Sequence, residues 1–208
     1  MKKFKPPLLV LLSFFLAILF GTLLLYLLPT SNEKLSLVDA IFTATSSVCV
    51  TGLIVKNTPL FFNSLGQFII LFLIQIGGLG IMTLYATLLH FLRGISKKQQ
   101  IIMKEILNEE EISGITKTIL FIIKFTIIVE GIGAILLFIN WWGIEESKLK
   151  LLWISIFHSV SAFCNAGFSL FPNSLEDFLT SPTTLLIFSF LIILGGICLL
   201  YTSPSPRD

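Results

Sequence analysis

Long stretches without a charged side chain constrain the fold of this chain more than any other feature of its sequence. One such stretch covers residues 6–32 and another covers residues 57–92. A hydrocarbon core about 30 Å thick is crossed by about 20 helical residues, because each residue of a helix rises 1.5 Å. Both stretches are long enough, so the sequence predicts membrane-spanning helices over residues 7–28 and 65–92.

The composition agrees with a membrane protein. Hydrophobic residues make up 55% of the chain and charged residues only 12%, whereas a soluble domain carries about 25% charged residues. Membrane lipid is therefore the expected surrounding. The net charge of +2 is too small to indicate a nucleic-acid partner, and we expect none.

The first stretch has a second interpretation, which is a secretory signal peptide. Lys2, Lys3 and Lys5 precede it, as basic residues precede the apolar region of such a signal. That region is about 7 to 15 residues long in signal peptides and is followed by a small-residue cleavage site. Because this run is longer and no such site follows it, the spanning helix is favoured.

Two short segments repeat one pattern. Residues 41–52 read IFTATSSVCVTG, and residues 156–167 read IFHSVSAFCNAG, with Ile, Phe, Ser, Cys and Gly at matching places. Each segment is too short to cross a bilayer alone. Irregular backbone at membrane depth is tolerated only where it is buried in protein or lines a wet cavity, and carbonyl groups there can replace the water shell of an ion. The pattern predicts pore helices with re-entrant loops over residues 38–53 and 151–168.

Both segments end at a glycine, Gly52 in one and Gly167 in the other. Glycine accepts a positive φ with little penalty, which a loop with carbonyl groups along one axis requires. The hydroxyl groups of Ser46, Ser47 and Ser161 are expected to hydrogen-bond these loops. A short helix that enters half the membrane also aims its partly negative C-terminal end at a cation. The sequence therefore predicts cation conduction rather than bond-making chemistry.

The second half of the chain repeats the plan of the first. Residues 118–142 and 183–200 are further predicted spans, and residues 93–117 form the most polar segment. That segment and the N-terminus hold most of the Lys and Arg residues outside the spans, so the positive-inside rule places both in the cytoplasm. The predicted fold is an all-α, multi-pass cell-membrane protein with two helix, re-entrant loop, helix repeats, residues 1–92 and 118–200.

Some polar and small residues inside the predicted spans need a role. Glu130 lies deep in a span, where an ionisable group is costly and indicates function; a structural pairing is favoured over direct contact with an ion, and both stay open. Gly77, Gly78 and Gly80 either let neighbouring helices approach closely or shape the wall of a pore.

Metal or catalytic chemistry is not indicated. Cys49, Cys164 and Cys198 have no partners at metal-ligand spacing, and neither His90 nor His158 has a carboxylate nearby in sequence. An enzyme of the membrane would show Asp, Glu, His or Cys clustered near one interface. We therefore expect no enzyme, no cofactor and no bound metal besides the transported ion.

Residues 39–53, followed by Gln67 and by LIQIGGLGIM at residues 73–82, resemble the first repeat of the Trk/Ktr/HKT superfamily of potassium uptake proteins. Residues 157–170 resemble its second selectivity filter. The resemblance extends over about residues 1–197 and is strongest to the N-terminal half of the Ktr-type membrane subunit, because the N-terminus before the first span is short.

The resemblance implies four repeats around a pseudo-fourfold pore that is selective for K⁺, with Na⁺ as a possible coupling ion. It also implies a homodimer on a cytoplasmic ring of nucleotide-binding regulatory subunits. Gly52 and Gly167 would be filter glycines. The carbonyl groups expected to bind K⁺ belong to Val48, Cys49, Val50, Thr51, Phe163, Cys164, Asn165 and Ala166.

The chain departs from that family in having two repeats instead of four. The prolines at 204 and 206 continue a spanning helix poorly, so we expect residues 198–208 to be a non-native or truncated end and the chain to be a fragment. Two alternatives are a half-size protein that dimerises into a four-loop cation pore, which a twofold axis allows, and a multi-pass scaffold that does not transport.

Overall fold

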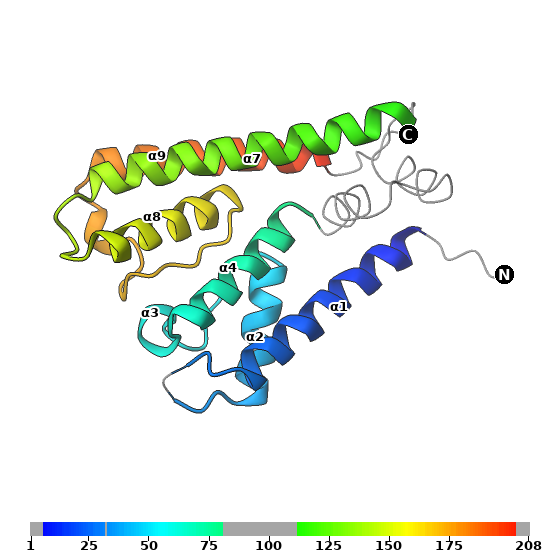
Figure 1. The fold of residues 1–208 in the computed structure, drawn as a ribbon, viewed down its shortest axis with the longest axis horizontal. Helices are drawn as coiled ribbons and strands as arrows, with labels where there is room; N and C mark the ends of the chain where they lie inside the picture. The colour runs from blue at the N-terminus through cyan, green and yellow to red at the C-terminus, as the bar shows by residue number, and fades with distance from the viewer. Residues whose placement is uncertain (1–5, 32, 81–111, 203–208) are drawn as a thin grey trace.

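A computed structural model describes residues 6–31, 33–80 and 112–202 of the chain. Within these ranges the backbone is helical, apart from loops and one isolated bridge between Ser31 and Phe62. The helices, in chain order, are α1 Pro6–Leu27, α2 Leu37–Val48, α3 Thr58–Phe61, α4 Ser64–Gly78, α7 Ile112–Asn140, α8 Lys148–Phe163, the 3₁₀ helix η1 Glu176–Phe178 and α9 Pro182–Thr202 (Figure 1).

Side-chain caps define where three of these helices begin. The Ser36 hydroxyl accepts a hydrogen bond of 3.1 Å from the backbone N–H of Asp39, and Ser147 caps α8 in the same way through Lys150. The Asn63 side chain accepts from the backbone N–H groups of Leu65 and Gly66, the second and third residues of α4. Such caps satisfy amide groups that have no partner inside the helix. Helices α2 and α8 therefore each start at a capping serine.

The helices form two groups that meet in the middle of the molecule. In the first group α2 packs against α1 and α4, and in the second α8 packs against α7 and α9. Helix α4 also contacts α8, which joins the groups (Figure 1). Each half of the chain thus has an inner helix that packs against the helix before it and against a helix after it.

Five of the six predicted spans and re-entrant segments contain helices close to their expected bounds, with differences at the ends. Helix α7 begins at Ile112, so the last residues of the predicted cytoplasmic segment 93–117 are helical. Helix α8 begins at Lys148 because Ser147 caps it there. Helix α9 continues to Thr202, which includes the first residues of the segment that we expected to be foreign.

The predicted span over residues 65–92 differs, because α4 ends at Gly78. The N–H of Gly80 bonds to the carbonyl of Gly77 at 3.0 Å, and Gly80 has a φ of +76°. A glycine in the left-handed conformation just after the last turn is a common way for a helix to end. Residues 81–92, with His90, and most of 93–117 lie outside the described residues.

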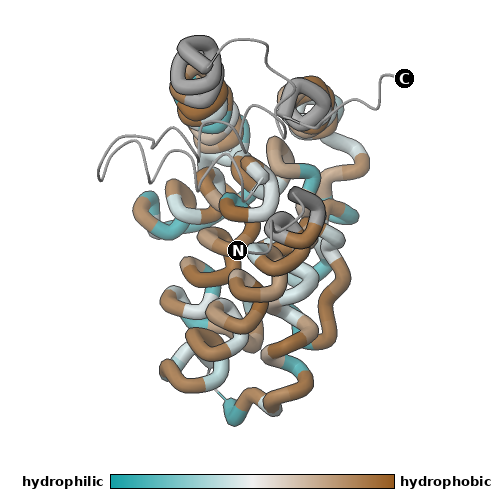
Figure 2. Tube along the Cα trace, turned by 90° about the vertical axis from the view of Figure 1, so that its right-hand side faces the viewer, coloured by the Kyte–Doolittle hydropathy of each residue, from teal (hydrophilic) through white to brown (hydrophobic). Residues whose placement is uncertain are grey.

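The described helices consist largely of hydrophobic residues, as the hydropathy colouring shows (Figure 2), and many of these residues are exposed. Leu11, Phe121, Ile127 and Ile139 each expose more than 60% of their surface. By length and composition alone, one segment in the described part of the chain, Leu120–Asn140, is long and apolar enough to cross a membrane. Exposed apolar area on this scale is unusual for soluble monomers and suits a protein surrounded by lipid.

Candidate functional site

The chain leaves α2 through loop 1, residues 49–53, and leaves α8 through loop 2, residues 164–168. The two loops have matching backbones. Val50 and Gly52 have φ values of +55° and +75° in loop 1, and Asn165 and Gly167 have φ values of +58° and +73° in loop 2. A β-branched residue with positive φ is a genuine outlier. Each loop therefore contains two left-handed residues, whereas the sequence predicted one, the glycine.

The amide groups of both loops point back into the helices that precede them. The Cys49 N–H bonds to the Thr45 carbonyl at 2.8 Å, and the Thr51 N–H bonds to the Ser46 carbonyl at 2.9 Å. Loop 2 repeats these bonds. The equivalent pairs are Cys164 to Val160 at 2.9 Å and Ala166 to Ser161 at 2.7 Å. The helix ends thus hold both loops in one conformation.

Hydroxyl groups support the loops, although not all as predicted. Ser46 and Thr51 share a hydrogen bond of 2.9 Å between their side chains, and the Ser161 hydroxyl donates to the Phe168 carbonyl at 2.7 Å. The Ser47 hydroxyl instead donates to the Thr43 carbonyl within α2. The expectation that Ser47 supports its loop through its side chain is therefore wrong, because a mid-helix serine can bond the carbonyl four residues earlier.

The two loops meet at their glycines. A Cβ atom added to Gly52 would lie 2.6 Å from the Ala166 carbonyl oxygen and 3.2 Å from the Gly167 Cα atom. A Cβ atom added to Gly167 would lie 3.4 Å from the Gly52 Cα atom. The matched residues of the internal repeat are therefore neighbours in space. A side chain at Gly52 would overlap the backbone of loop 2, whereas a Cβ atom at Gly167 would lie at an ordinary contact distance from Gly52.

Glycines on the next helices press against the start of each loop. A Cβ atom on Gly77 of α4 would overlap the Val48 carbonyl oxygen, and one on Gly195 of α9 would overlap the Phe163 carbonyl oxygen. Close helix packing, one of the two roles we considered for these glycines, is thus present at Gly77. The carbonyl oxygens of Val48 and Phe163, two of the predicted ligands, lie against α4 and α9.

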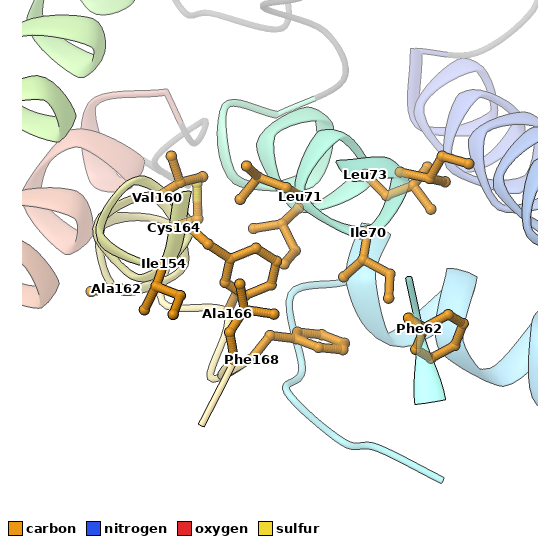
Figure 3. Close-up of a cluster of buried hydrophobic side chains, with 14 of the residues drawn as sticks. Phe62, Ile70, Leu71, Leu73, Ile154, Val160, Ala162, Cys164, Ala166 and Phe168 are labelled. Atoms are coloured by element: carbon orange, nitrogen blue, oxygen red, sulfur yellow. The ribbon is translucent and has the colours of Figure 1, made fainter. Parts of the chain in front are cut away.

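The contact between the halves uses another glycine. A Cβ atom on Gly78 would lie 2.6 Å from the Cys164 Cβ atom. Figure 3 shows the buried apolar cluster around this contact, where Leu71 of α4 faces Val160 of α8 and Cys164. The Trp153 indole N–H also donates to the Gln67 side chain across the junction at 2.9 Å. The junction therefore places loop 2 directly beside α4.

Glu130 of α7 contacts both sides of this junction, which are α4 and loop 2. Its Oε1 atom accepts a hydrogen bond of 3.0 Å from the Gln75 side chain of α4, and the Cys164 thiol lies 4.0 Å from the same oxygen. The backbone carbonyl of Glu130 accepts from the Ser159 hydroxyl at 2.7 Å. Glu130 is thus paired with protein groups, which is the structural alternative, and links α4, α7 and α8.

Replacing Gln75 with leucine is expected to destabilise the junction by about 1–3 kcal/mol, because a partly buried carboxyl group loses its donor. The double exchange Gln75→Glu with Glu130→Gln keeps one amide and one carboxyl group and should recover much of the loss. Thermal unfolding in detergent measures both effects. If the stability losses of the single exchanges Gln75→Glu and Glu130→Gln simply add in the double exchange, the two side chains do not form this pair.

No resident metal site accompanies the loops in the part of the chain that the structure describes. No three His, Cys, Asp or Glu side chains lie close enough there to hold a metal ion, and Cys49, Cys164 and Cys198 are free thiols. The described site consists of backbone and hydroxyl groups, which are ligands for hard monovalent cations rather than for transition metals.

Comparison with known proteins identifies relatives that are all described as cation transport or potassium uptake proteins. The family model described as "Cation transport protein", TrkH, matches residues 5–199. The chain is 44% identical over 201 residues to the potassium/sodium uptake protein NtpJ of Enterococcus hirae, covering 94% of this chain and 44% of that protein. It is 41% identical over 197 residues to the Ktr system potassium uptake protein B of Bacillus subtilis, with the same coverage.

A third relative is the Ktr system potassium uptake protein B of Vibrio alginolyticus, which is 39% identical over 192 residues, covering 92% of this chain and 42% of that protein. The chain thus spans less than half the length of the curated relatives that it matches. Because the family model matches nearly all of its residues, the chain belongs to the TrkH family of cation transport proteins.

Proposed function

We propose that this chain is part of a membrane protein that takes up potassium ions, and that loops 1 and 2 form part of its selectivity filter. The observation that carries the proposal is the matched pair of loops, with the same left-handed residues and with Gly52 and Gly167 in contact. The names of the relatives, which are potassium uptake proteins, support K⁺ as the substrate.

The loops offer carbonyl groups where a cation needs them. Helices α2 and α8 both end at the loops, so the partly negative end of each helix lies beside them. Loop carbonyl groups can then replace the water shell of K⁺. We assign the ligands to the carbonyl groups after the helix ends, which include Val50, Thr51, Asn165 and Ala166, with the filter glycines.

A filter of four loops explains why Gly196 and Cys49 each lack the neighbour that their counterparts have. Gly78 of α4 packs against Cys164 of loop 2, but the matching residue of α9, Gly196, has no atom within 4 Å of an added Cβ among the described residues. Likewise Cys49 is exposed where its counterpart Cys164 is buried. The contact that Gly78 makes with Cys164 is thus missing at Gly196 in the second repeat and at Cys49 in the first.

Two further repeats would supply these neighbours for Gly196 and Cys49. We favour a longer natural protein that contains them, since the relatives are about twice as long. A second copy of this chain is the alternative, because Gly196 of one copy could receive Cys49 of the other. The variant Gly196→Cys distinguishes the two. A disulfide with Cys49 between two copies of this chain supports the dimer. No disulfide with Cys49 in the longer protein, where Gly196 would face a third loop instead, supports the four-repeat protein.

The remaining features of the proposal follow the family resemblance. The N-terminus lies in the cytoplasm, the assembled protein is a homodimer, and it sits on a ring of nucleotide-binding regulatory subunits. The word "system" in the names of the Bacillus and Vibrio relatives supports a transporter with other components. Na⁺ is the proposed coupling ion, which the name of the Enterococcus relative supports.

Growth of a bacterial host without its own potassium uptake systems tests the function. The longer protein, expressed with its regulatory subunit, is expected to restore growth at micromolar K⁺, and the 208-residue chain alone is not. Protein that reaches the membrane in both forms but never restores growth would contradict potassium uptake. Growth restored by the short chain alone would instead favour the dimer of half-size proteins.

A further inference from the structure

The imidazole ring of His158 connects α8 to the part of the chain that follows loop 2. The ring is buried, with 1% of its surface exposed. Its Nδ1 atom lies 2.8 Å from the Ile154 carbonyl oxygen. A carbonyl group can only accept, so Nδ1 carries the hydrogen and Nε2 of the neutral ring is an acceptor. This geometry assigns one tautomer to His158.

The acceptor nitrogen faces the chain just beyond Gly167. The backbone N–H of Leu170 donates to Nε2 at 3.3 Å, and the Ser169 hydroxyl lies 2.9 Å from the same nitrogen. The Ser169 oxygen in turn accepts from the Phe171 N–H at 3.0 Å. One ring therefore holds three consecutive residues of the outgoing chain, beginning two positions after the filter glycine.

Aromatic side chains surround this ring. Phe171 stacks on His158 with ring centroids 4.8 Å apart, and the Trp141 ring meets it edge-on at 5.3 Å. Phe188 of α9 completes the enclosure at 6.1 Å. A hydrogen bond in such surroundings is costly to leave unmade. A cavity of about 230 Å³ lies beside the ring and also borders Gly167.

Loop 1 has no equivalent ring. The residue that matches His158 in the internal repeat is Thr43, whose side chain is too short to cross to the outgoing chain. Loop 1 is closed instead by the hydrogen bond between Ser46 and Thr51. The two loops share a backbone conformation but are held by different side chains.

We propose that His158 is a positioning residue for ion selection, which fixes the chain that leaves loop 2 at Ser169 and Leu170 and thereby sets the place of the Gly167 carbonyl group. The inference rests on the proposed function, because it concerns the discrimination of K⁺ from Na⁺. A larger K⁺ ion is preferred over Na⁺ only while the carbonyl groups keep their number and spacing. Loss of the ring's acceptor therefore relaxes selection through loop 2.

The full natural protein with its regulatory subunit, in potassium-uptake-deficient cells, provides the test. His158→Phe fits the aromatic enclosure but leaves the Leu170 N–H without an acceptor. It should raise the KM for K⁺ and lower the preference for K⁺ over Na⁺ roughly tenfold, with a smaller change in maximal rate. His158→Gln, whose amide oxygen can accept, should recover part of the preference. Thr43→Val, at the matching position of α2, is the matched control.

Unchanged KM and unchanged preference in His158→Phe, with normal protein in the membrane, would overturn the proposal. If His158→Phe does not accumulate, Ser169→Ala carries the test. It removes the hydroxyl between the ring and Phe171 and should lower the preference in the same direction, while an unchanged preference would overturn the proposal. Failure of the wild-type protein to take up K⁺ would count against the proposed function itself, so the two failures are distinguishable.

Discussion

Gly52→Ala is expected to abolish potassium uptake by the longer protein. Gly52 has a φ of +75°, and the new Cβ atom would lie 2.6 Å from the Ala166 carbonyl oxygen and 3.2 Å from the Gly167 Cα atom. The left-handed conformation costs alanine about 1–2 kcal/mol, and the overlap is with backbone, so loop 2 must move. Both neighbours belong to the proposed filter, and potassium-limited uptake in deficient cells measures the effect.

Two other glycines provide matched comparisons for that variant. Gly131 lies on α7, where no atom of the described residues is within 4 Å of an added Cβ, so Gly131→Ala should transport like the wild type. Gly167→Ala has a φ of +73° but its nearest atom is 3.4 Å away, so we expect partial transport with weaker discrimination against Na⁺. Wild-type uptake by Gly52→Ala would show that the contact between the loops does not limit transport.

The second large effect is expected at Gly195, where alanine would place its Cβ atom on the Phe163 carbonyl oxygen. Packing an extra methyl group against a backbone that cannot move freely costs about 1–3 kcal/mol. It would also push α9 away from the end of α8, where loop 2 begins. Gly195→Ala should therefore lower both the thermal stability in detergent and the rate of uptake.

The next residue of the same helix is the control. Gly196 has an open space around the added Cβ among the described residues, so Gly196→Ala should leave the stability of the 208-residue chain unchanged. In the longer protein a further loop is proposed to fill that space, and the same variant should then reduce uptake. Equal stability of the Gly195 and Gly196 variants of the short chain would contradict the close contact at Gly195.

The internal repeat predicted helices that end shortly before Gly52 and Gly167, and α2 and α8 lie there; the role of the two glycines in transport stays a prediction. Both signals are local, since an apolar segment too short to span and a terminal glycine can be read along the chain. The family resemblance then added the substrate. The family match over residues 5–199 confirms the resemblance, while the ion ligands stay a prediction.

Other parts of the site could not be predicted, because they depend on tertiary contacts. Valine strongly resists positive φ, so nothing in the sequence indicated the left-handed Val50. The pairing of Glu130 with Gln75 arises only when α7 meets α4. The end of α4 did have a local signal, since Gly80 follows two other glycines, but the apolar run beyond it favoured a longer helix.

Ion flux through the purified longer protein in liposomes tests the central claim most directly, which is that loops 1 and 2 form a K⁺-selective path. With a K⁺ gradient, the wild-type protein should carry K⁺ in preference to Na⁺, and Gly52→Ala, inserted at the same density, should carry neither. Flux without preference for K⁺, or an unchanged K⁺ flux through Gly52→Ala, would contradict the account.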